Sequence, residues 1–317
     1  MRHADDELYP PCPPDLSGML AASATHTLAW RAAGRRDGVP ALLIHGGPGG
    51  GACPVQRRLL DPGFYRIVQL DQRGCGESRP HAETAENTTA DLIADMERLR
   101  RHLGIARWLL VGGSWGATLA LGYAQAHPER VRGLILRGVF LGRAREIRWF
   151  LSGMGTIFPE AWGRFAGHLA PAERGDLLHA YHARLMHPDP RVHLPAACAW
   201  ARYEAACCSL IPSDSWALPA RDPAALALAR LEAHYFIHNV FLGENALLAG
   251  MPAIRHLPAA IVQGRYDMVC PIASADALRR AWPEAAWTVV PDAGHAALEP
   301  GIRRAVMRAA ERFKTLR

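Results

Sequence analysis

The chain has 317 residues, half of them hydrophobic, which suffices for one large α/β core with an inserted segment, and its net charge of +6 comes from scattered arginines without the basic run typical of nucleic-acid binding. No run of about 18 apolar residues predicts a membrane span, and no apolar stretch typical of a signal peptide follows the polar residues 1–7. Seven irregularly spaced cysteines without a Cys-x-x-Cys indicate neither a disulfide framework nor a zinc site, so we expect a cytoplasmic protein that binds neither nucleic acid nor membrane.

The first part of the chain alternates segments typical of strands and helices. Short apolar runs predict strands, and the glycine-rich segment 45–51 that follows the first of them predicts a tight loop. Apolar residues at helical spacing predict a helix over residues 89–103. The predicted strands are residues 40–44, 65–70, 108–111 and 131–137. This alternation is typical of a mostly parallel sheet with helices on both faces.

The pattern changes after residue 141 and returns near the carboxyl end. Residues 142–251 read as helices without clear strands, broken by Pro171, Pro188, Pro195, Pro212 and Pro219. Residues 259–263 and 287–290 then predict strands, and residues 272–282 and 301–313 predict helices. We therefore expect a core of residues 1–141 and 252–317 around a helical cap of residues 142–251.

A nucleophile motif lies at the end of the third of the predicted strands. Gly112-x-Ser114-x-Gly116 comes after an apolar strand and before a helix, where a sharp turn tolerates only glycine beside the serine. The motif alone is common and also fits an ordinary tight turn. Its strand-turn-helix setting favours Ser114 as a nucleophile.

A serine hydroxyl needs a base to take its proton and a carboxylate to orient that base. Asp267 follows the strand predicted over residues 259–263, and His295 follows the strand predicted over residues 287–290. Asp276 and Asp292 compete for the role of the acid, but catalytic groups of open α/β sheets gather at the carboxyl ends of strands. The order Ser114, Asp267, His295 is that of an α/β-hydrolase triad.

The glycine-rich loop suits the stabilisation of a tetrahedral oxyanion by backbone N–H groups. We expect the N–H of Trp115, next after the nucleophile, to be one donor and that of Gly46 or Gly47 to be the other. A phosphate cradle or a plain turn is the alternative. The loop lacks both the Gly-Lys-Ser/Thr of a P-loop and the spacing of a dinucleotide fingerprint.

The motifs together resemble those of the proline iminopeptidases (prolyl aminopeptidases), a branch of the α/β-hydrolases. The resemblance covers most of the expected core and extends into the cap. It rests on residues 45–50, 71–76, 87–89, 112–121, 126–130 and 264–267 of the core and on residues 136–140, 200–204 and 229–236 at and within the cap.

The resemblance implies an exopeptidase that releases N-terminal proline from small peptides. It implies that Glu204 and Glu232 hold the free amino terminus and that Phe140 packs against the proline ring, with Arg137 and Tyr203 also at the substrate. Without the resemblance, the two glutamates read as ordinary solvated residues. The family often has an aromatic-rich run where this chain has residues 151–153, so one pocket wall is expected to differ.

The expected mechanism is acyl transfer without a metal or organic cofactor. An esterase or small-amide hydrolase of the same fold remains the alternative, because the fold and the triad do not determine the substrate. A non-catalytic binding protein that kept the core is a more remote alternative.

Overall fold

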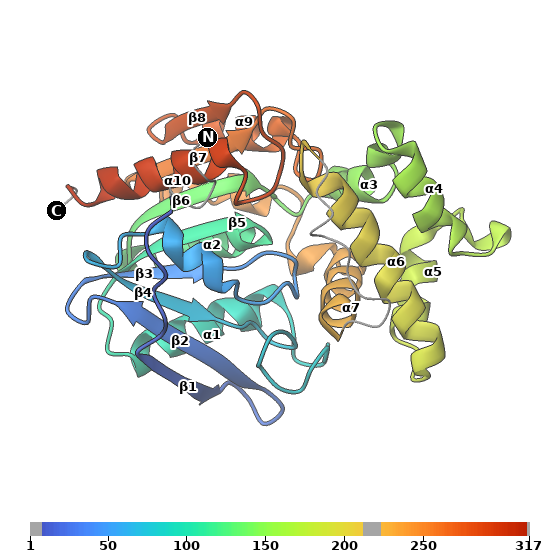
Figure 1. The fold of residues 1–317 in the computed structure, drawn as a ribbon, viewed down its shortest axis with the longest axis horizontal. Helices are drawn as coiled ribbons and strands as arrows, with labels where there is room; N and C mark the ends of the chain where they lie inside the picture. The colour runs from blue at the N-terminus through green and yellow to red at the C-terminus, as the bar shows by residue number, and fades with distance from the viewer. Residues whose placement is uncertain (1–7, 212–222, 316–317) are drawn as a thin grey trace.

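The computed structural model describes residues 8–211 and 223–315, and these contain a twisted eight-stranded sheet with helices around it (Figure 1). The strands occur in the spatial order β1-β2-β4-β3-β5-β6-β7-β8. Their bounds are β1 Leu16–Ala21, β2 Thr27–Gly34, β3 Val39–Ile44, β4 Tyr65–Leu70, β5 Trp108–Ser114, β6 Val131–Val139, β7 Ala259–Gly264 and β8 Ala286–Val290.

The strands from β4 to β8 pair in parallel, whereas β1 and β2 form an antiparallel edge. The carboxyl ends of β3, β5, β7 and β8 therefore meet at one edge of the sheet. His45, Ser114, Asp267 and His295 stand at or just beyond these ends. The mostly parallel sheet and the α/β-hydrolase class predicted from the sequence are confirmed.

Side chains of the central strands alternate between two apolar layers. In β5, Trp108 and Leu110 belong to the larger hydrophobic cluster, and Leu109 and Val111 belong to a second cluster on the opposite face. Burial on both faces explains why such strands read as continuous apolar runs. The core helices are α1 Thr89–His102, α2 Trp115–Ala126 and α9 Ile272–Ala281, which contribute to the larger cluster, and α10 Pro300–Phe313, which contributes to the second.

Helix α1 illustrates how local sequence sets an element's start. Thr88 accepts a hydrogen bond from the N–H of Asp91, and the Asp91 carboxylate accepts one from the N–H of Thr88. This capping box satisfies two N–H groups that the first turn leaves without partners. Three basic residues in the last turn complement the negative end of the helix dipole.

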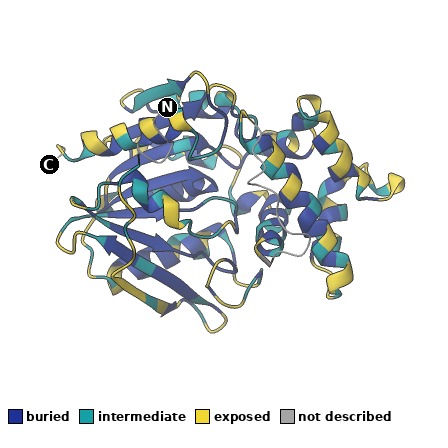
Figure 2. Cartoon of the chain, viewed as in Figure 1, coloured by how far each residue is buried: buried dark blue, intermediate teal, exposed yellow. Residues whose placement is uncertain are grey.

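The residues between β6 and β7 form helices that lie beyond the carboxyl edge of the sheet (Figure 1). We call α3 to α8 the inserted helices. They are α3 Ala144–Leu151, α4 Pro159–Gly167, α5 Leu177–Leu185, α6 Pro190–Cys208, α7 Pro223–Ile237 and α8 Ala246–Ala249. Their inner faces are buried and the outer faces of α4 and α5 are exposed (Figure 2).

A group of aromatic rings fills the space among the inserted helices. Phe165 stacks on Tyr181 with ring centroids 4.4 Å apart and on Tyr203 at 4.5 Å. Trp200 packs edge-on against Phe165 at 5.6 Å. Offset and edge-to-face ring pairs add stability beyond their buried area.

Two strands were not predicted. No element was predicted for residues 16–38, where the structure forms β1 and β2. Strand β1 is an edge strand with mostly exposed side chains, so it lacks the apolar run that marks the central strands. The polar segment 1–7 and two of the expected helix breakers, Pro212 and Pro219, lie outside the described residues. Within residues 8–211 and 223–315, no helix is long and apolar enough to cross a membrane.

Candidate active site

Ser114 lies in a strained turn between β5 and α2. Its backbone has φ 58° and ψ −127°, a combination that residues other than glycine rarely adopt. A Cβ at Gly112 would stand 2.2 Å from the carbonyl oxygen of Gly116, and one at Gly116 would stand 2.2 Å from that of Ile44. Both glycines are therefore required by close backbone approach, and the turn is that of a nucleophile elbow.

Asp267 and His295 are joined by a hydrogen bond of 2.8 Å between Oδ2 and Nδ1. The N–H of Cys270 donates to Asp267 Oδ1 at 2.8 Å, and Gln263 Nε2 donates to Oδ2 at 3.1 Å. Asp267 is 2% exposed and His295 is 6% exposed. A buried, hydrogen-bonded carboxylate on Nδ1 leaves Nε2 as the nitrogen that can accept a proton.

The loop that carries His295 is held by the inserted helices. The carbonyl oxygen of Cys208, at the end of α6, accepts the N–H groups of His295 at 2.8 Å and Ala296 at 2.9 Å. Arg137 Nη1 donates to the carbonyl oxygen of His295 at 2.8 Å. The position of the histidine thus depends on contacts from both β6 and α6.

Ser114 and His295 line one cavity of about 310 Å³ between the sheet edge and the inserted helices. Its walls combine the glycine-rich loop, Ser114 and His295 with side chains of α6 and α7, whereas Asp267 lies behind His295 and does not line it. The lining residues are Gly46, Gly47, Gly50, Ser114, Arg137, Ala201, Glu204, Ala205, Cys208, Ala224, Ala225, Leu228 and His295. The hydroxyl of Ser114 also lies 3.9 Å from Cys270 Sγ.

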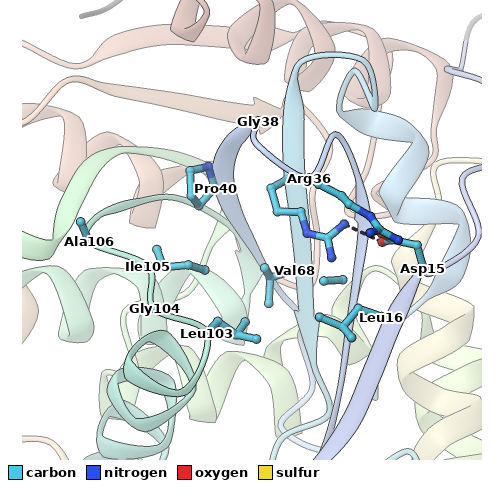
Figure 3. Close-up of a pocket in the computed structure, with 12 residues that line it drawn as sticks. Asp15, Leu16, Arg36, Gly38, Pro40, Val68, Leu103, Gly104, Ile105 and Ala106 are labelled. Atoms are coloured by element: carbon cyan, nitrogen blue, oxygen red, sulfur yellow. Dashed lines mark hydrogen bonds and ion pairs between the residues drawn. The ribbon is translucent and has the colours of Figure 1, made fainter.

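A larger cavity of about 490 Å³ opens elsewhere (Figure 3). Gly38 and Pro40 place it at the amino end of β3, roughly 20 Å of strand away from the carboxyl edge. Arg36 there forms an ion pair with Asp15 at 3.0 Å. Its lining holds no serine, cysteine or histidine, so the smaller cavity is the candidate active site.

Two carboxyl groups meet beside the smaller cavity. Glu204 on α6 lines it, and the side chain of Glu232 on α7, 2% exposed, forms a hydrogen bond with the side chain of Glu204. Trp200 Nε1 donates to Glu232 Oε2 at 2.5 Å. A hydrogen bond between two carboxyls requires a shared proton.

Burial raises the pKa of both carboxyl groups. The pKa of Glu204 rises to about 7 because of burial, although the proximity of His295 and the hydrogen bond with Glu232 oppose the shift. The pKa of Glu232 lies well above its usual value, because burial, the charge of Glu204 and its hydrogen bond all favour the protonated form. The pair therefore retains a proton at pH values at which a free carboxyl is ionised.

The expected oxyanion donors lie beside the nucleophile. A Cβ on Gly46 would stand 3.4 Å from Ser114 Cβ and 3.9 Å from Oγ, and Gly47 lines the same cavity. Trp115 is the first residue of α2, where a helix leaves its N–H groups without internal partners. The structure thus places Gly46 and Trp115 next to Ser114 and Gly47 at the same cavity.

The other predicted substrate residues are placed differently. Phe140 follows β6 and packs against Phe236 of α7, with centroids 6.1 Å apart. Arg137 lines the cavity but uses Nη1 on the His295 loop. Tyr203 does not line this cavity, because its hydroxyl donates to the carbonyl oxygen of Phe150 at 2.9 Å within the aromatic group of the inserted helices.

Sequence reasoning assigned no role to several residues that complete the site. Gln263 and Cys270 position Asp267, and Gln72 contacts both the glycine-rich loop and Trp115. Gln72 lies in the segment 71–76, which is one of the motifs of the family resemblance. That motif is the sequence feature that could have identified Gln72. Among the described residues, no three His, Cys, Asp or Glu side chains are arranged to hold a metal ion.

Comparison with known proteins places the chain among relatives of the same fold. A family described as having the alpha/beta hydrolase fold matches residues 39–301. A probable proline iminopeptidase of Leptolyngbya boryana is 48% identical over 310 residues, which cover 97% of each chain. A proline iminopeptidase of Arabidopsis thaliana is 49% identical over 313 residues, which cover 98% of this chain and 82% of that protein.

Solved structures share the fold at lower identity. The crystal structure of a proline iminopeptidase from Mycobacterium smegmatis matches with a TM-score of 0.63 and 20% identity over 94% of this chain and 99% of that chain. An esterase from Rhodococcus sp. ECU1013 matches with a TM-score of 0.62 and 20% identity over 95% of this chain and 99% of that chain. These two likenesses establish the fold alone, since a peptidase and an esterase match equally well.

Proposed function

This chain belongs to the proline iminopeptidase family of the α/β-hydrolases, and from that membership we propose that it releases proline from the free amino terminus of small peptides. The observation that carries the proposal is the pair of carboxyl groups, half-buried Glu204 and buried Glu232, beside the cavity that holds Ser114 and His295. Two acidic groups at such a place suit a substrate that brings a positive charge.

In the proposed mechanism, Ser114 attacks the carbonyl carbon of the N-terminal prolyl residue. His295 Nε2 takes the hydroxyl proton and returns it to the leaving amine, and Asp267 orients the ring and stabilises its charged form. The N–H groups of Trp115 and of Gly46 or Gly47 stabilise the oxyanion. Water then hydrolyses the prolyl-enzyme ester with the same base.

The proposed role of the two glutamates is to bind the secondary ammonium of the substrate. Binding replaces the shared proton by a cation, so both carboxyls become acceptors of charge-assisted hydrogen bonds. Glu204 is linked to the reacting centre, since it stands one turn before Cys208, whose carbonyl oxygen holds the His295 loop. Anchoring the amino terminus there leaves room for one residue before the scissile bond, which makes the enzyme an exopeptidase.

The proposed proline site lies near Phe140 and Phe236, whose rings offer an apolar wall. Tyr203 supports this wall indirectly by packing among the inserted helices. Arg137 lines the cavity and holds the His295 loop in place through its hydrogen bond to the His295 carbonyl oxygen. The segment 142–251 serves as a cap domain that encloses the substrate. All seven cysteines are free, which supports the reducing, cytoplasmic setting expected from the sequence.

The decisive experiment compares kcat/KM for prolyl arylamide, N-blocked prolyl arylamide and a short-chain nitrophenyl ester. We expect the free prolyl substrate to be preferred over the blocked form by at least tenfold, roughly the contribution of one charge-assisted hydrogen bond. Ser114→Ala should lower turnover of all substrates by about 10⁶-fold. Efficient ester turnover without a preference for the free amino terminus would contradict the peptidase proposal and favour an esterase.

A paired variant tests the role of the carboxyls. Glu204→Gln should raise KM for the free prolyl arylamide and leave the ester unaffected, because only the former carries an ammonium group. Glu129→Gln is the matched control, since that glutamate is 59% exposed and pairs with Arg130 on the surface. Equal effects of Glu204→Gln on the two substrates would exclude ammonium binding by this residue.

A further inference from the structure

Gln72 connects the two halves of the oxyanion site. Its Nε2 donates to the carbonyl oxygen of His45 at 2.9 Å, in the loop after β3. Its Oε1 accepts the indole Nε1–H of Trp115 at 3.0 Å, in the turn after β5. The side chain is 5% exposed, so these two bonds form in a water-poor environment where they strongly constrain geometry.

The first bond determines the direction of one backbone donor. The peptide between His45 and Gly46 is trans, so its C=O and N–H point in opposite directions. Because Gln72 holds the His45 carbonyl oxygen, the Gly46 N–H must point away from Gln72. Gly46 is also the loop residue in closest approach to Ser114, with 3.9 Å between its ideal Cβ position and the hydroxyl oxygen.

The ring of His45 determines the direction of the next donor. The N–H of Gln72 donates to His45 Nε2 at 3.1 Å, so the proton of the neutral ring is on Nδ1, which lies 2.9 Å from the carbonyl oxygen of Gly46. Burial lowers the pKa of His45 and favours this neutral form. With the Gly46 carbonyl held, the Gly47 N–H is directed to the other side of its peptide.

Few other donors are available in this loop. Pro48 has no N–H, and the N–H of Gly50 donates to the Gly46 carbonyl oxygen at 3.2 Å. Among the described residues, the N–H groups of Gly46 and Gly47 donate to no backbone oxygen and can serve an oxyanion. Gln72 controls both, the first through its side chain and the second through its own backbone N–H on His45.

We propose that Gln72 is a positioning residue that sets the spacing between the loop donors at Gly46 and Gly47 and the donor at Trp115. It does not line the cavity that holds Ser114 and acts through His45 on one side and the Trp115 indole on the other. The inference rests on the proposed acyl transfer by Ser114, but not on the choice of proline as substrate.

The test uses Gln72→Met, which keeps the approximate volume and removes both hydrogen bonds. Gln69→Met is the matched control, because Gln69 is 2% exposed and also donates to a loop carbonyl, that of Cys53, while accepting from Arg57. Both variants lose a buried bridge of similar kind, but only Gln72 contacts the oxyanion loop and Trp115.

We expect Gln72→Met to lower kcat on the nitrophenyl ester and on prolyl arylamide by about 10- to 100-fold with KM within about twofold. Outright loss of one oxyanion donor costs roughly 10²- to 10³-fold, and misalignment should cost less. Gln69→Met should keep kcat near that of the wild type. A kcat loss in Gln72→Met no larger than in Gln69→Met, or a change confined to KM, would overturn the proposal.

Gln72→Glu adds a readout that a purely structural role would not produce. The ionised carboxylate accepts from Trp115 but repels the His45 carbonyl oxygen, whereas the protonated carboxyl donates to that oxygen and restores both bonds. Its ester kcat relative to the wild type at the same pH should therefore rise as pH falls, and that of Gln72→Met should stay constant. A flat ratio for Gln72→Glu would also count against the proposal.

The ester separates this inference from the proposed function. If the wild-type protein hydrolyses the ester but shows no preference for a free prolyl amino terminus, the peptidase proposal fails and the Gln72 comparison can still be made. If the peptidase proposal holds and the Gln72 variants keep full kcat, only the positioning role is rejected.

Discussion

At the scale of single residues, the geometry at Ser114 and His295 depends on where side chains are missing. Gly138, near the end of β6, has φ +50°, and a Cβ there would stand 3.0 Å from His295 Cε1 and Nδ1 and 3.1 Å from Asp267 Oδ2. The hydrogen bond between Asp267 and His295 therefore lies directly against the backbone of Gly138, with no room for a side chain. A glycine with no reactive group can therefore determine the relative positions of His295 and Asp267.

We predict that Gly138→Ala lowers kcat by on the order of 10²-fold, because the methyl group must push the His295 ring away from Asp267 and loss of the correct orientation can cost up to about 10⁴-fold. The measurement is kcat on prolyl arylamide and on an ester. The backbone cost of alanine at positive φ is separated with Gly104→Ala, whose glycine has φ +65° and no atom within 4 Å of the added Cβ. Equal activities in the two variants would refute the prediction.

At the scale of elements, helices α6 and α7 bring together two glutamates that are far apart in sequence. Trp200 and Glu204 are four residues apart and share one face of α6, and Glu232 projects from α7. The sequence contains both glutamates, but their hydrogen bond follows from how the two helices pack, which no spacing within one helix encodes. This is why the sequence predicted the residues through a family resemblance and not through geometry.

We predict that KM for prolyl arylamide rises as pH falls from about 8 to 6. The pKa of Glu204 lies at about 7 in the free enzyme, so acidification protonates it and removes a negative charge that the substrate ammonium needs. The nitrophenyl ester is the reference, because it carries no ammonium and its KM should not follow the same curve. A parallel pH dependence of both KM values would contradict the assignment.

The same pair should reduce the stability of the empty enzyme at neutral pH. The pKa of Glu232 is raised above its usual value of 4.5 in the folded chain, so the folded state binds more protons than the unfolded state above that pH. Stability present at low pH is therefore progressively lost as pH rises from about 4.5 towards the raised pKa. The loss of stability arises because ionising the buried Glu232 carboxyl leaves a charge without hydration.

We predict that Glu232→Gln raises the Tm of the substrate-free protein by a few degrees at pH 8 and by less at pH 5, since a difference of about 1 kcal/mol shifts Tm by roughly 2–4 °C in a chain of this size class. The amide can still accept from Trp200 and donate to Glu204. KM for prolyl arylamide should rise in the same variant. The prediction fails if the change in Tm is the same at both pH values or matches that of Glu129→Gln.

At the scale of the whole molecule, the parallel sheet, its central strands and the strand ends that carry Ser114, Asp267 and His295 were predictable from apolar runs and glycine motifs. Strand β1 was not, because an exposed antiparallel edge leaves a weaker pattern, and β2, although buried, is a mixed segment that Arg31 interrupts. The position of Gln72 could not be derived either. Its two partners lie 27 residues before it and 43 residues after it, and only the pairing of β3 between β4 and β5 brings them together.

The sheet and the inserted helices share one apolar core. The larger hydrophobic cluster includes Trp108 of β5 and Trp200 of α6. Buried polar contacts also cross the boundary: the Tyr235 hydroxyl donates to Asn87 Oδ1 at 2.8 Å, and Trp115 packs on the Tyr235 ring with centroids 4.7 Å apart. The aromatic group of the inserted helices is therefore continuous with the core of the sheet, and we expect the two parts to unfold together.

We predict that Tyr235→Phe lowers the free energy of unfolding by about 1–2 kcal/mol, because it removes the hydroxyl and leaves the buried Asn87 oxygen without that donor. Since the contact joins α7 to the core, the midpoint of urea unfolding should shift equally for far-UV circular dichroism, tryptophan fluorescence and loss of esterase activity. Tyr266→Phe, at a residue that is 48% exposed, is the control and should leave the midpoint unchanged. If fluorescence and activity were lost at lower urea than the circular dichroism signal, the inserted helices would unfold independently and the shared core would not be the unit of stability.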